Sequence, residues 1–206
     1  MLTWPNRITL ARICLIPLFV MAILQVHGQA DSESVFRYLA FGLFMLMAVT
    51  DAVDGILARA RGEKSFLGRI LDPLADKFLL TTACVLLSCD FWPQPRLPNW
   101  VPVLVISRDV IIVVGVAVIF LMTGALKAGP TLIGKITTVV QMVTVLLALL
   151  NNWFPVWLVK ASWWITVVFT CVSGLQYVYI GSRQFNYAGA AATASPKGPG
   201  TPPAQS

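Results

Sequence analysis

Long apolar segments are the feature that most limits how this chain can fold. Hydrophobic side chains make up 57% of the residues, and charged side chains make up only 12%. Inside a bilayer a chain has to satisfy its backbone hydrogen bonds internally, and a segment of about 20 apolar residues does so as a helix. We therefore expect an all-α integral membrane protein.

The length of the chain sets the number of such helices. Its 206 residues leave room for six transmembrane helices with short connections. The expected spans cover residues 8–28, 36–59, 68–90, 99–123, 133–151 and 157–182. Together they form one membrane domain over residues 1–185. Residues 186–206 are expected to be a disordered tail, because a segment rich in Ala, Ser, Pro and Gly cannot bury a core.

The positive charges indicate how the helices are oriented. The net charge of +6 is concentrated near both termini and in the second and fourth connections, which the positive-inside rule places in the cytoplasm. The opposite side carries fewer basic residues, namely Arg37, Arg96 and Lys160. The sequence thus predicts cytoplasmic termini and no nucleic-acid partner. Because the N-terminus has no cleavable signal or transit pattern, we expect a multi-pass protein of a prokaryotic plasma membrane.

Four aspartates interrupt this apolar pattern. The chain has only nine acidic residues, yet Asp51, Asp54, Asp72 and Asp76 fall within segments hydrophobic enough to enter a membrane. A carboxylate at membrane depth is costly unless it is paired or coordinated, so its presence indicates a functional site. On helices, Asp51 and Asp54 share one face, and Asp72 and Asp76 share another.

The connection between the two acidic segments allows them to form one site. Two helices joined by a polar connection at residues 59–65 can turn their acidic faces toward each other. Such a cage of oxygen ligands suits Mg²⁺ or Mn²⁺ better than Zn²⁺. Four carboxylates indicate two divalent ions, which can hold phosphates during an in-line displacement. A solvated helix face or a salt-bridge network explains the aspartates less well, because the surroundings are apolar and contain few cations.

The spacing of this motif resembles that of a known family. The pattern Asp51-x2-Asp54-Gly55-x2-Ala58-Arg59-x8-Gly68-x3-Asp72-x3-Asp76 is similar to the signature of the CDP-alcohol phosphotransferases at every fixed position. The resemblance extends over about residues 4–183. It implies a homodimeric enzyme that transfers a phosphatidyl group from CDP-diacylglycerol to a lipid or glycerol-phosphate acceptor and releases CMP.

The resemblance also implies roles for individual residues. Asp51, Asp54 and Asp72 would bind the two metal ions, and Asp76 would complete the cage and act as the general base. The implied CDP-binding residues are Gly55, Ala58, Arg59 and Gly68.

Cations outside the motif are candidates for binding an acceptor or a phosphate. Arg69 adjoins the motif, Arg108 lies among valines and isoleucines, and Lys135 opens the fifth expected helix. For Arg108 the alternative is an internal ion pair with Asp109 or Asp72. For Lys135 the alternative is a simple topological charge.

The N-terminal segment supplies three weaker candidates. Its Pro-Asn-x-x-Thr-x-x-Arg pattern resembles the start of the phosphatidylglycerophosphate and cardiolipin synthase branches, in which polar residues border the nucleotide site. The matching residues are Asn6, Thr9 and Arg12. Arg12 could instead extend along the helix toward the membrane surface.

The acceptor depends on residues outside the motif. The runs Ser107-Arg108-Asp109-Val110 and Gly134-Lys135-Ile136-Thr137-Thr138 resemble the CMP-forming cardiolipin synthases. Glycerol-phosphate enzymes typically have Arg-Glu in the first run and Lys-x-Lys-Thr in the second. The chain lacks that second lysine, so we expect phosphatidylglycerol as the acceptor, with glycerol 3-phosphate as the alternative.

Two other classes of protein would also place polar groups in membrane helices. A metal-ion or proton transporter needs carboxylates near the bilayer midplane with access from both sides, whereas these aspartates lie near one boundary. A purely structural membrane subunit would leave the aspartates unexplained. Both classes are therefore less favoured than a phosphotransferase.

Overall fold

The regular structure of the chain is entirely helical where it is described. The computed structural model describes residues 4–26, 33–61, 66–123 and 131–193. Within these ranges the side chains of residues 4–9, 33–34, 54–74, 76, 119–120, 122–123 and 181–193 lie outside the description. The helices are α1 (Trp4–Gln25), α2 (Glu33–Arg61), α3 (Phe66–Ser88), α4 (Trp100–Thr123), α5 (Leu132–Leu149) and α6 (Val156–Thr193). Each overlaps one expected span, so the all-α prediction is confirmed for the described residues.

Four of these helices are long and apolar enough to cross a membrane. The qualifying segments are Val35–Val53, Trp100–Val118, Leu132–Leu149 and Val156–Ile180. The described parts of α1 and α3 contain the shorter apolar stretches Leu10–Gln25 and Lys77–Ser88. The run of consecutive described side chains begins at Leu10 in α1 and at Lys77 in α3. Six crossings and cytoplasmic termini therefore remain predictions.

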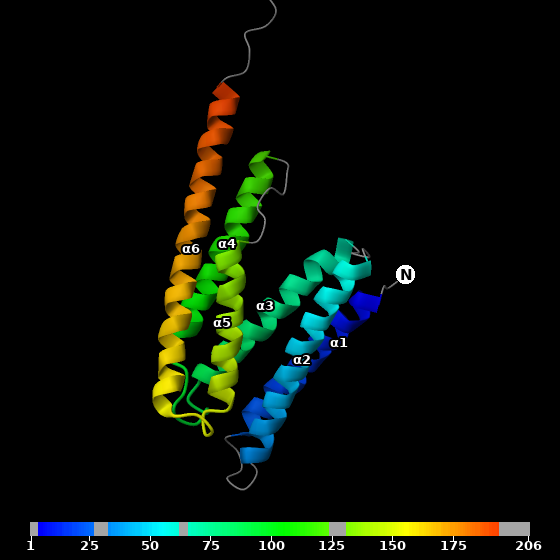
Figure 1. Ribbon diagram of the computed structural model, residues 1–206, viewed down its shortest axis with the longest axis vertical. Coiled ribbons are helices and arrows are strands. Elements are labelled where there is room, and N and C mark those ends of the chain that lie inside the picture. The colour runs from blue at the N-terminus through cyan, green and yellow to red at the C-terminus, as the bar shows by residue number, and fades with distance from the viewer. Residues whose placement is uncertain (1–3, 27–32, 62–65, 124–130, 194–206) are drawn as a thin grey trace, which may run out of the picture.

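The helices form two groups that meet at one end of the molecule and diverge toward the other (Figure 1). Helix α1 packs against α2 and α3, and α6 packs against α4 and α5. Helix α3 also contacts α4 and α5, so it connects the two groups. The acidic ends of α2 and α3 lie where the groups diverge.

The end of α6 differs from its expected boundary. The helix continues to Thr193, so the first part of the tail expected from residue 186 is helical. The rest of that tail, residues 194–206, lies outside the described residues.

A ladder of uncharged polar contacts joins α5 to α6. Hydroxyl and amide groups at three buried positions of α5 meet α6 at successive turns. The contacts are Thr137 Oγ1 donating to the Phe169 carbonyl (3.2 Å), Gln141 Nε2 donating to Thr170 Oγ1 (3.4 Å), and Thr144 Oγ1 bonding to Thr166 Oγ1 (2.7 Å). Such hydrogen bonds hold membrane helices together, since hydrocarbon offers no competing partners.

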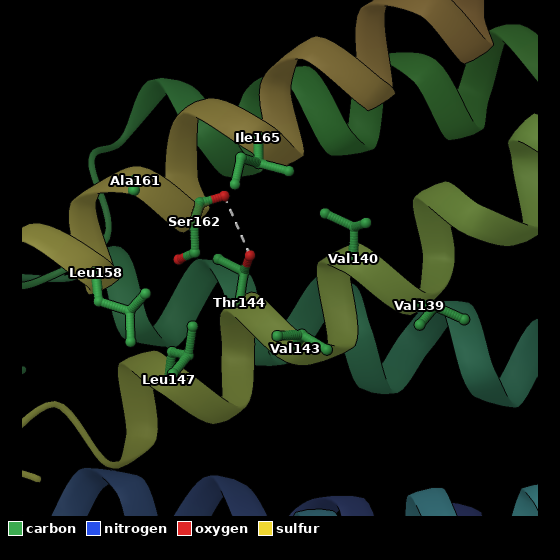
Figure 2. Close-up of a pocket in the computed structure, with 9 residues that line it drawn as sticks. All are labelled: Val139, Val140, Val143, Thr144, Leu147, Leu158, Ala161, Ser162 and Ile165. Carbon is green, nitrogen blue, oxygen red and sulfur yellow. Dashed lines mark hydrogen bonds between the residues drawn. The ribbon is translucent and has the colours of Figure 1, made fainter. Parts of the chain in front are cut away.

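An apolar hollow of about 280 Å³ lies beside this ladder, between α5 and α6 (Figure 2). Val143 and Leu147 line it from α5, and Leu158 lines it from α6. Its polar groups are already engaged, because Thr144 Oγ1 contacts the Ser162 carbonyl at 3.3 Å and Ser162 Oγ donates to the Val159 carbonyl. The hollow therefore offers no group suited to phosphate chemistry.

Arg37 lies near the start of the expected span 36–59. In the structure it is a residue of α2 with only 2% of its surface exposed. Its Nη1 donates to Asn151 Oδ1 at 2.5 Å, and its guanidinium lies 5.5 Å from the centroid of the Trp92 ring. Asn151 Nδ2 in turn donates to the carbonyls of Pro93 (3.2 Å) and Pro95 (3.4 Å). We call Arg37, Trp92 and Asn151 the Arg37 cluster.

The Arg37 cluster explains how the two helix groups are joined. Arg37 belongs to α2, Trp92 to the connection between α3 and α4, and Asn151 to the connection between α5 and α6. These segments come together at the end of the molecule where the groups meet (Figure 1). A buried arginine requires such partners, because its charge has lost its hydration.

Candidate active site

The acidic motif occupies two adjoining helix ends. Helix α2 carries the first half of the motif near its C-terminus, and α3 carries the second half near its N-terminus. The backbone is thus helical at both halves, as the spacing predicted. Among the side chains of the motif, that of Asp51 is described. The others lie outside the description, namely those of Asp54, Gly55, Ala58, Arg59, Gly68, Asp72 and Asp76, and so does that of the neighbouring Arg69.

Arg12 of α1 reaches into this site. Its Nη1 lies 2.5 Å from Asp51 Oδ1, and its side chain is 2% exposed, whereas that of Asp51 is 33% exposed. Arg12 therefore does not extend to the membrane surface, and the alternative that it points toward the motif is the one the structure supports. The side chains of the other two N-terminal candidates, Asn6 and Thr9, lie outside the description.

The chemistry of the motif fits a hard divalent cation. Its potential ligands are carboxylates, without a thiol or an imidazole. A carboxylate has about four lone-pair sites, so the bond from Arg12 leaves Asp51 able to accept a further partner. No three His, Cys, Asp or Glu side chains gather as a metal site within the described part of the chain, to which Asp51 alone of the four motif aspartates belongs.

A second charged cluster lies on the neighbouring helices. Asp109 Oδ1 of α4 accepts from Lys77 Nζ of α3 at 2.5 Å and from Arg108 Nη1 at 2.8 Å. Arg108 also donates to Ser173 Oγ of α6, from Nε at 3.2 Å and from Nη2 at 2.7 Å. The internal pair of Arg108 with Asp109, one of the two interpretations of this segment, is therefore present. We call Lys77, Arg108, Asp109 and Ser173 the Asp109 cluster.

Gly134 provides the space that Arg108 occupies. A Cβ atom on Gly134 would lie 3.2 Å from Arg108 Nη2 and 3.1 Å from Thr131 Oγ1. Thr131 caps α5, because its Oγ1 accepts from the backbone N–H of Gly134, and its own N–H donates to the Tyr177 hydroxyl. The absence of a side chain at position 134 thus lets the start of α5 approach the arginine of α4.

Lys135 follows directly on α5 and is exposed. Gln141, further along α5, is buried toward α6. The two residues therefore face different surroundings. The charge of Lys135 remains accessible to an anion.

Replacing Gly134 by Ala should reduce activity and stability, because the new Cβ would crowd Arg108 and the cap of α5. We expect catalytic activity to fall about tenfold and the free energy of unfolding to fall by about 1–3 kcal/mol, as for an overpacked site. Gly174→Ala is the matched control, since its Cβ would lie at an ordinary 3.8 Å from Arg108 Cγ. Initial rates and unfolding midpoints in detergent measure both effects. Equal losses in the two variants would contradict the role of Gly134.

Apolar helices that carry a carboxylate-rich motif at one end fit the class of membrane-embedded transferases. Comparison with known proteins gives the family. The family model for CDP-alcohol phosphatidyltransferase matches residues 2–172. The chain belongs to this family, whose members act in phospholipid synthesis and use divalent metal ions.

The names of the relatives of this chain give two different activities. The CDP-diacylglycerol–glycerol-3-phosphate 3-phosphatidyltransferase of Bacillus subtilis is 36% identical over 86% of this chain and 94% of its own length. A protein of the same name from Aquifex aeolicus is 34% identical over 65% of this chain and 68% of its own length. The human CMP-forming cardiolipin synthase is 30% identical over 88% of this chain and 62% of its own length. The family is therefore established, and the acceptor is not determined by these names.

Proposed function

We propose that this enzyme transfers a phosphatidyl group from CDP-diacylglycerol to the free hydroxyl of phosphatidylglycerol and releases CMP. The product would be cardiolipin. The observation that carries this proposal is the pattern of cations at the start of α5, where Lys135 is exposed and Thr137 is buried.

The charge of the acceptor explains why this pattern matters. Phosphatidylglycerol is a phosphodiester with one negative charge, whereas glycerol 3-phosphate is a phosphomonoester that carries up to two. Thr137, where a second lysine would suit a dianion, donates to the carbonyls of Ile133 and Phe169. Arg108 is held by Asp109 and Ser173. Among the described residues at the start of α5, Lys135 is an accessible cation, and a single positive charge is better matched to the monoanion. Arg69 is a further candidate beside the motif.

The residues of the motif would divide the chemistry among them. Asp51, Asp54, Asp72 and Asp76 would hold two divalent ions, Mg²⁺ or Mn²⁺, which supply positive charge to the diphosphate of the donor. Asp76 takes the proton of the acceptor hydroxyl, and the oxygen then forms a bond to the phosphorus that carries diacylglycerol. The bond from that phosphorus to the oxygen of CMP breaks. Arg59 pairs with phosphate, while Gly55, Ala58 and Gly68 allow the nucleotide a close approach.

Arg12 has a supporting role in this arrangement. Its ion pair with Asp51 orients one carboxylate of the motif from a third helix, α1. Asn6 and Thr9 precede it on α1 and are proposed to border the nucleotide. Positioning of this kind, together with charge stabilisation, accounts for most of the rate in phosphoryl transfer.

Glycerol 3-phosphate is the second candidate acceptor. It is favoured by one specific observation, the 36% identity to a Bacillus subtilis protein named for that acceptor, of which the chain covers 94%. In that case the product would be phosphatidylglycerophosphate. A metal-ion transporter has no comparable support.

The proposal also includes a location and an assembly state. The excess of Lys and Arg near the motif supports a location of the active site on the cytoplasmic side of a prokaryotic plasma membrane. There the site meets a water-soluble nucleotide group and lipid tails at once. A homodimer is proposed by analogy with the family.

Supplying the two acceptors in parallel tests the proposed function. With CDP-diacylglycerol and Mg²⁺ or Mn²⁺ in mixed micelles, we expect CMP release with phosphatidylglycerol to be at least about tenfold faster than with glycerol 3-phosphate, a difference of about 1.4 kcal/mol in activation free energy. EDTA should stop the reaction, and added Mg²⁺ or Mn²⁺ should restore it. Faster release with glycerol 3-phosphate would establish the second candidate. The lipid product identifies the acceptor independently.

A further inference from the structure

The Asp109 cluster links three helices through charged groups inside the membrane region. Lys77 belongs to α3, Arg108 and Asp109 to α4, and Ser173 to α6. Asp109 Oδ1 lies 2.5 Å from Lys77 Nζ and 2.8 Å from Arg108 Nη1. A single carboxylate oxygen thus accepts hydrogen bonds from two cationic side chains, which belong to two different helices.

The position of Asp109 is itself fixed. Arg108 is buried, and two of its nitrogens donate to Ser173 Oγ. Gly134 leaves space for the outer nitrogen of the same guanidinium. Because Arg108 is held on one side by α6 and lies against α5 on another, the carboxylate bound to it is held as well. Lys77 therefore pairs with a group that has little freedom to move.

Holding helices together does not by itself require these charges. Helices α5 and α6 are joined by the uncharged ladder of threonine and glutamine side chains. Burying a charged group in a membrane costs more free energy than burying such a neutral group. Charged groups within membrane helices therefore mark functional sites. Among the described residues, the ion pair that joins α3 to α4 is formed by Lys77 and Asp109. Lys77 directly follows Asp76 of the motif.

We propose that Asp109 is a positioning residue for the catalytic end of α3 and acts through Lys77. The proposal rests on the proposed function of Asp76 as the general base. Successive residues of an α-helix are rotated by about 100° and separated by about 1.5 Å along the axis. Fixing Lys77 against Asp109 consequently fixes the rotation of α3 at position 76. Lys77 is only 33% exposed, and its ammonium group faces α4.

A double-mutant cycle tests this proposal in the full-length protein. Lys77→Met and Asp109→Asn should each lower kcat for CMP release about 10- to 100-fold, as expected for a displaced catalytic group, and leave KM for CDP-diacylglycerol within about twofold of its original value. The double variant should be little worse than either single variant, because both remove the same contact. Asp109→Glu, which retains the carboxylate, should recover most of kcat.

Two controls separate positioning from other roles. Lys160→Met removes an exposed lysine at the opposite end of α6 and should leave kcat unchanged. Unfolding midpoints in detergent show whether each variant is folded. If Asp109→Asn does not fold, Lys77→Arg keeps the charge but moves its donor, and it should lower kcat severalfold with KM unchanged.

The remaining outcomes overturn the proposal in distinguishable ways. A raised KM with unchanged kcat in Lys77→Met would indicate that Lys77 contacts the substrate. Multiplicative losses in the double variant, or unaltered kcat in both single variants, would show that Asp109 does not act through Lys77. If the unaltered protein released no CMP with either acceptor, the proposed function and this inference would both be wrong. An active unaltered protein with unaffected variants would overturn the inference alone.

Discussion

Asp76→Asn should reduce CMP release by about 10²- to 10⁴-fold, the range typical for loss of a general acid or base. The amide is almost the same size as the carboxyl group, but it cannot take a proton from the acceptor hydroxyl. It is also a weaker ligand for a divalent cation. Initial rates with saturating CDP-diacylglycerol and each acceptor measure the effect.

The matched control is an aspartate at the other end of the molecule. Asp90 is 93% exposed and pairs with Arg96 in the connection after α3. Asp90→Asn should keep the rate of the unaltered protein within about twofold, because a surface ion pair contributes little. Retention of normal activity by Asp76→Asn would exclude Asp76 as the base. Equal losses in the two variants would indicate a general effect of removing negative charge.

Arg37→Met should lower the free energy of unfolding by about 2–4 kcal/mol. The substitution keeps much of the apolar stem but removes a charged hydrogen bond to Asn151 and a cation–π contact with Trp92. The buried side chain of Asn151 would then lose one of its hydrogen-bond partners. Unfolding midpoints of the purified protein in detergent measure this loss.

Arg96→Met provides the comparison for this substitution. Arg96 is 36% exposed, and its partner Asp90 is almost fully exposed, so its loss should change the midpoint very little. Asn151→Leu should destabilise the protein in the same direction as Arg37→Met. An unchanged midpoint in Arg37→Met would mean that the Arg37 cluster does not hold the two helix groups together.

The helices were predictable because their signal is local. Each is a long apolar run bounded by polar or proline-rich segments, and the structure places a helix at every such run. The tail was predicted less well, because composition alone did not reveal that α6 continues to Thr193. Alanine-rich sequence favours a helix that is already started, even without a core to bury it.

The contacts of the buried cations were not predictable in the same way. Arg12 and Asp51 are separated by 39 positions in the sequence, Arg108 and Ser173 by 65, and Arg37 and Asn151 by 114. No periodicity within one helix indicates a partner on another. The sequence therefore left two alternatives for Arg12 and two for Arg108, and it indicated no partner for Arg37. A single charge within an apolar helix was the available signal that such a partner exists.

The small residues Ser173 and Gly174 of α6 permit a close approach of Arg108 from α4. Ser173 accepts two hydrogen bonds from Arg108, and Gly174 lies against the stem of the same side chain. A small residue on a membrane helix indicates a close approach, although it does not say which residue approaches.

The Arg37 cluster has a consequence for the order in which the protein is assembled. Arg37 is synthesised 114 residues before Asn151, so α2 enters the membrane before that hydrogen-bond partner exists. The stem of an arginine near a helix end can extend to the interface, which makes this early state tolerable. Docking of α2 onto the connection between α5 and α6 is then a late step of biogenesis. Chains shortened before residue 151 should stall as a loosely joined group of early helices, open to degradation by membrane proteases.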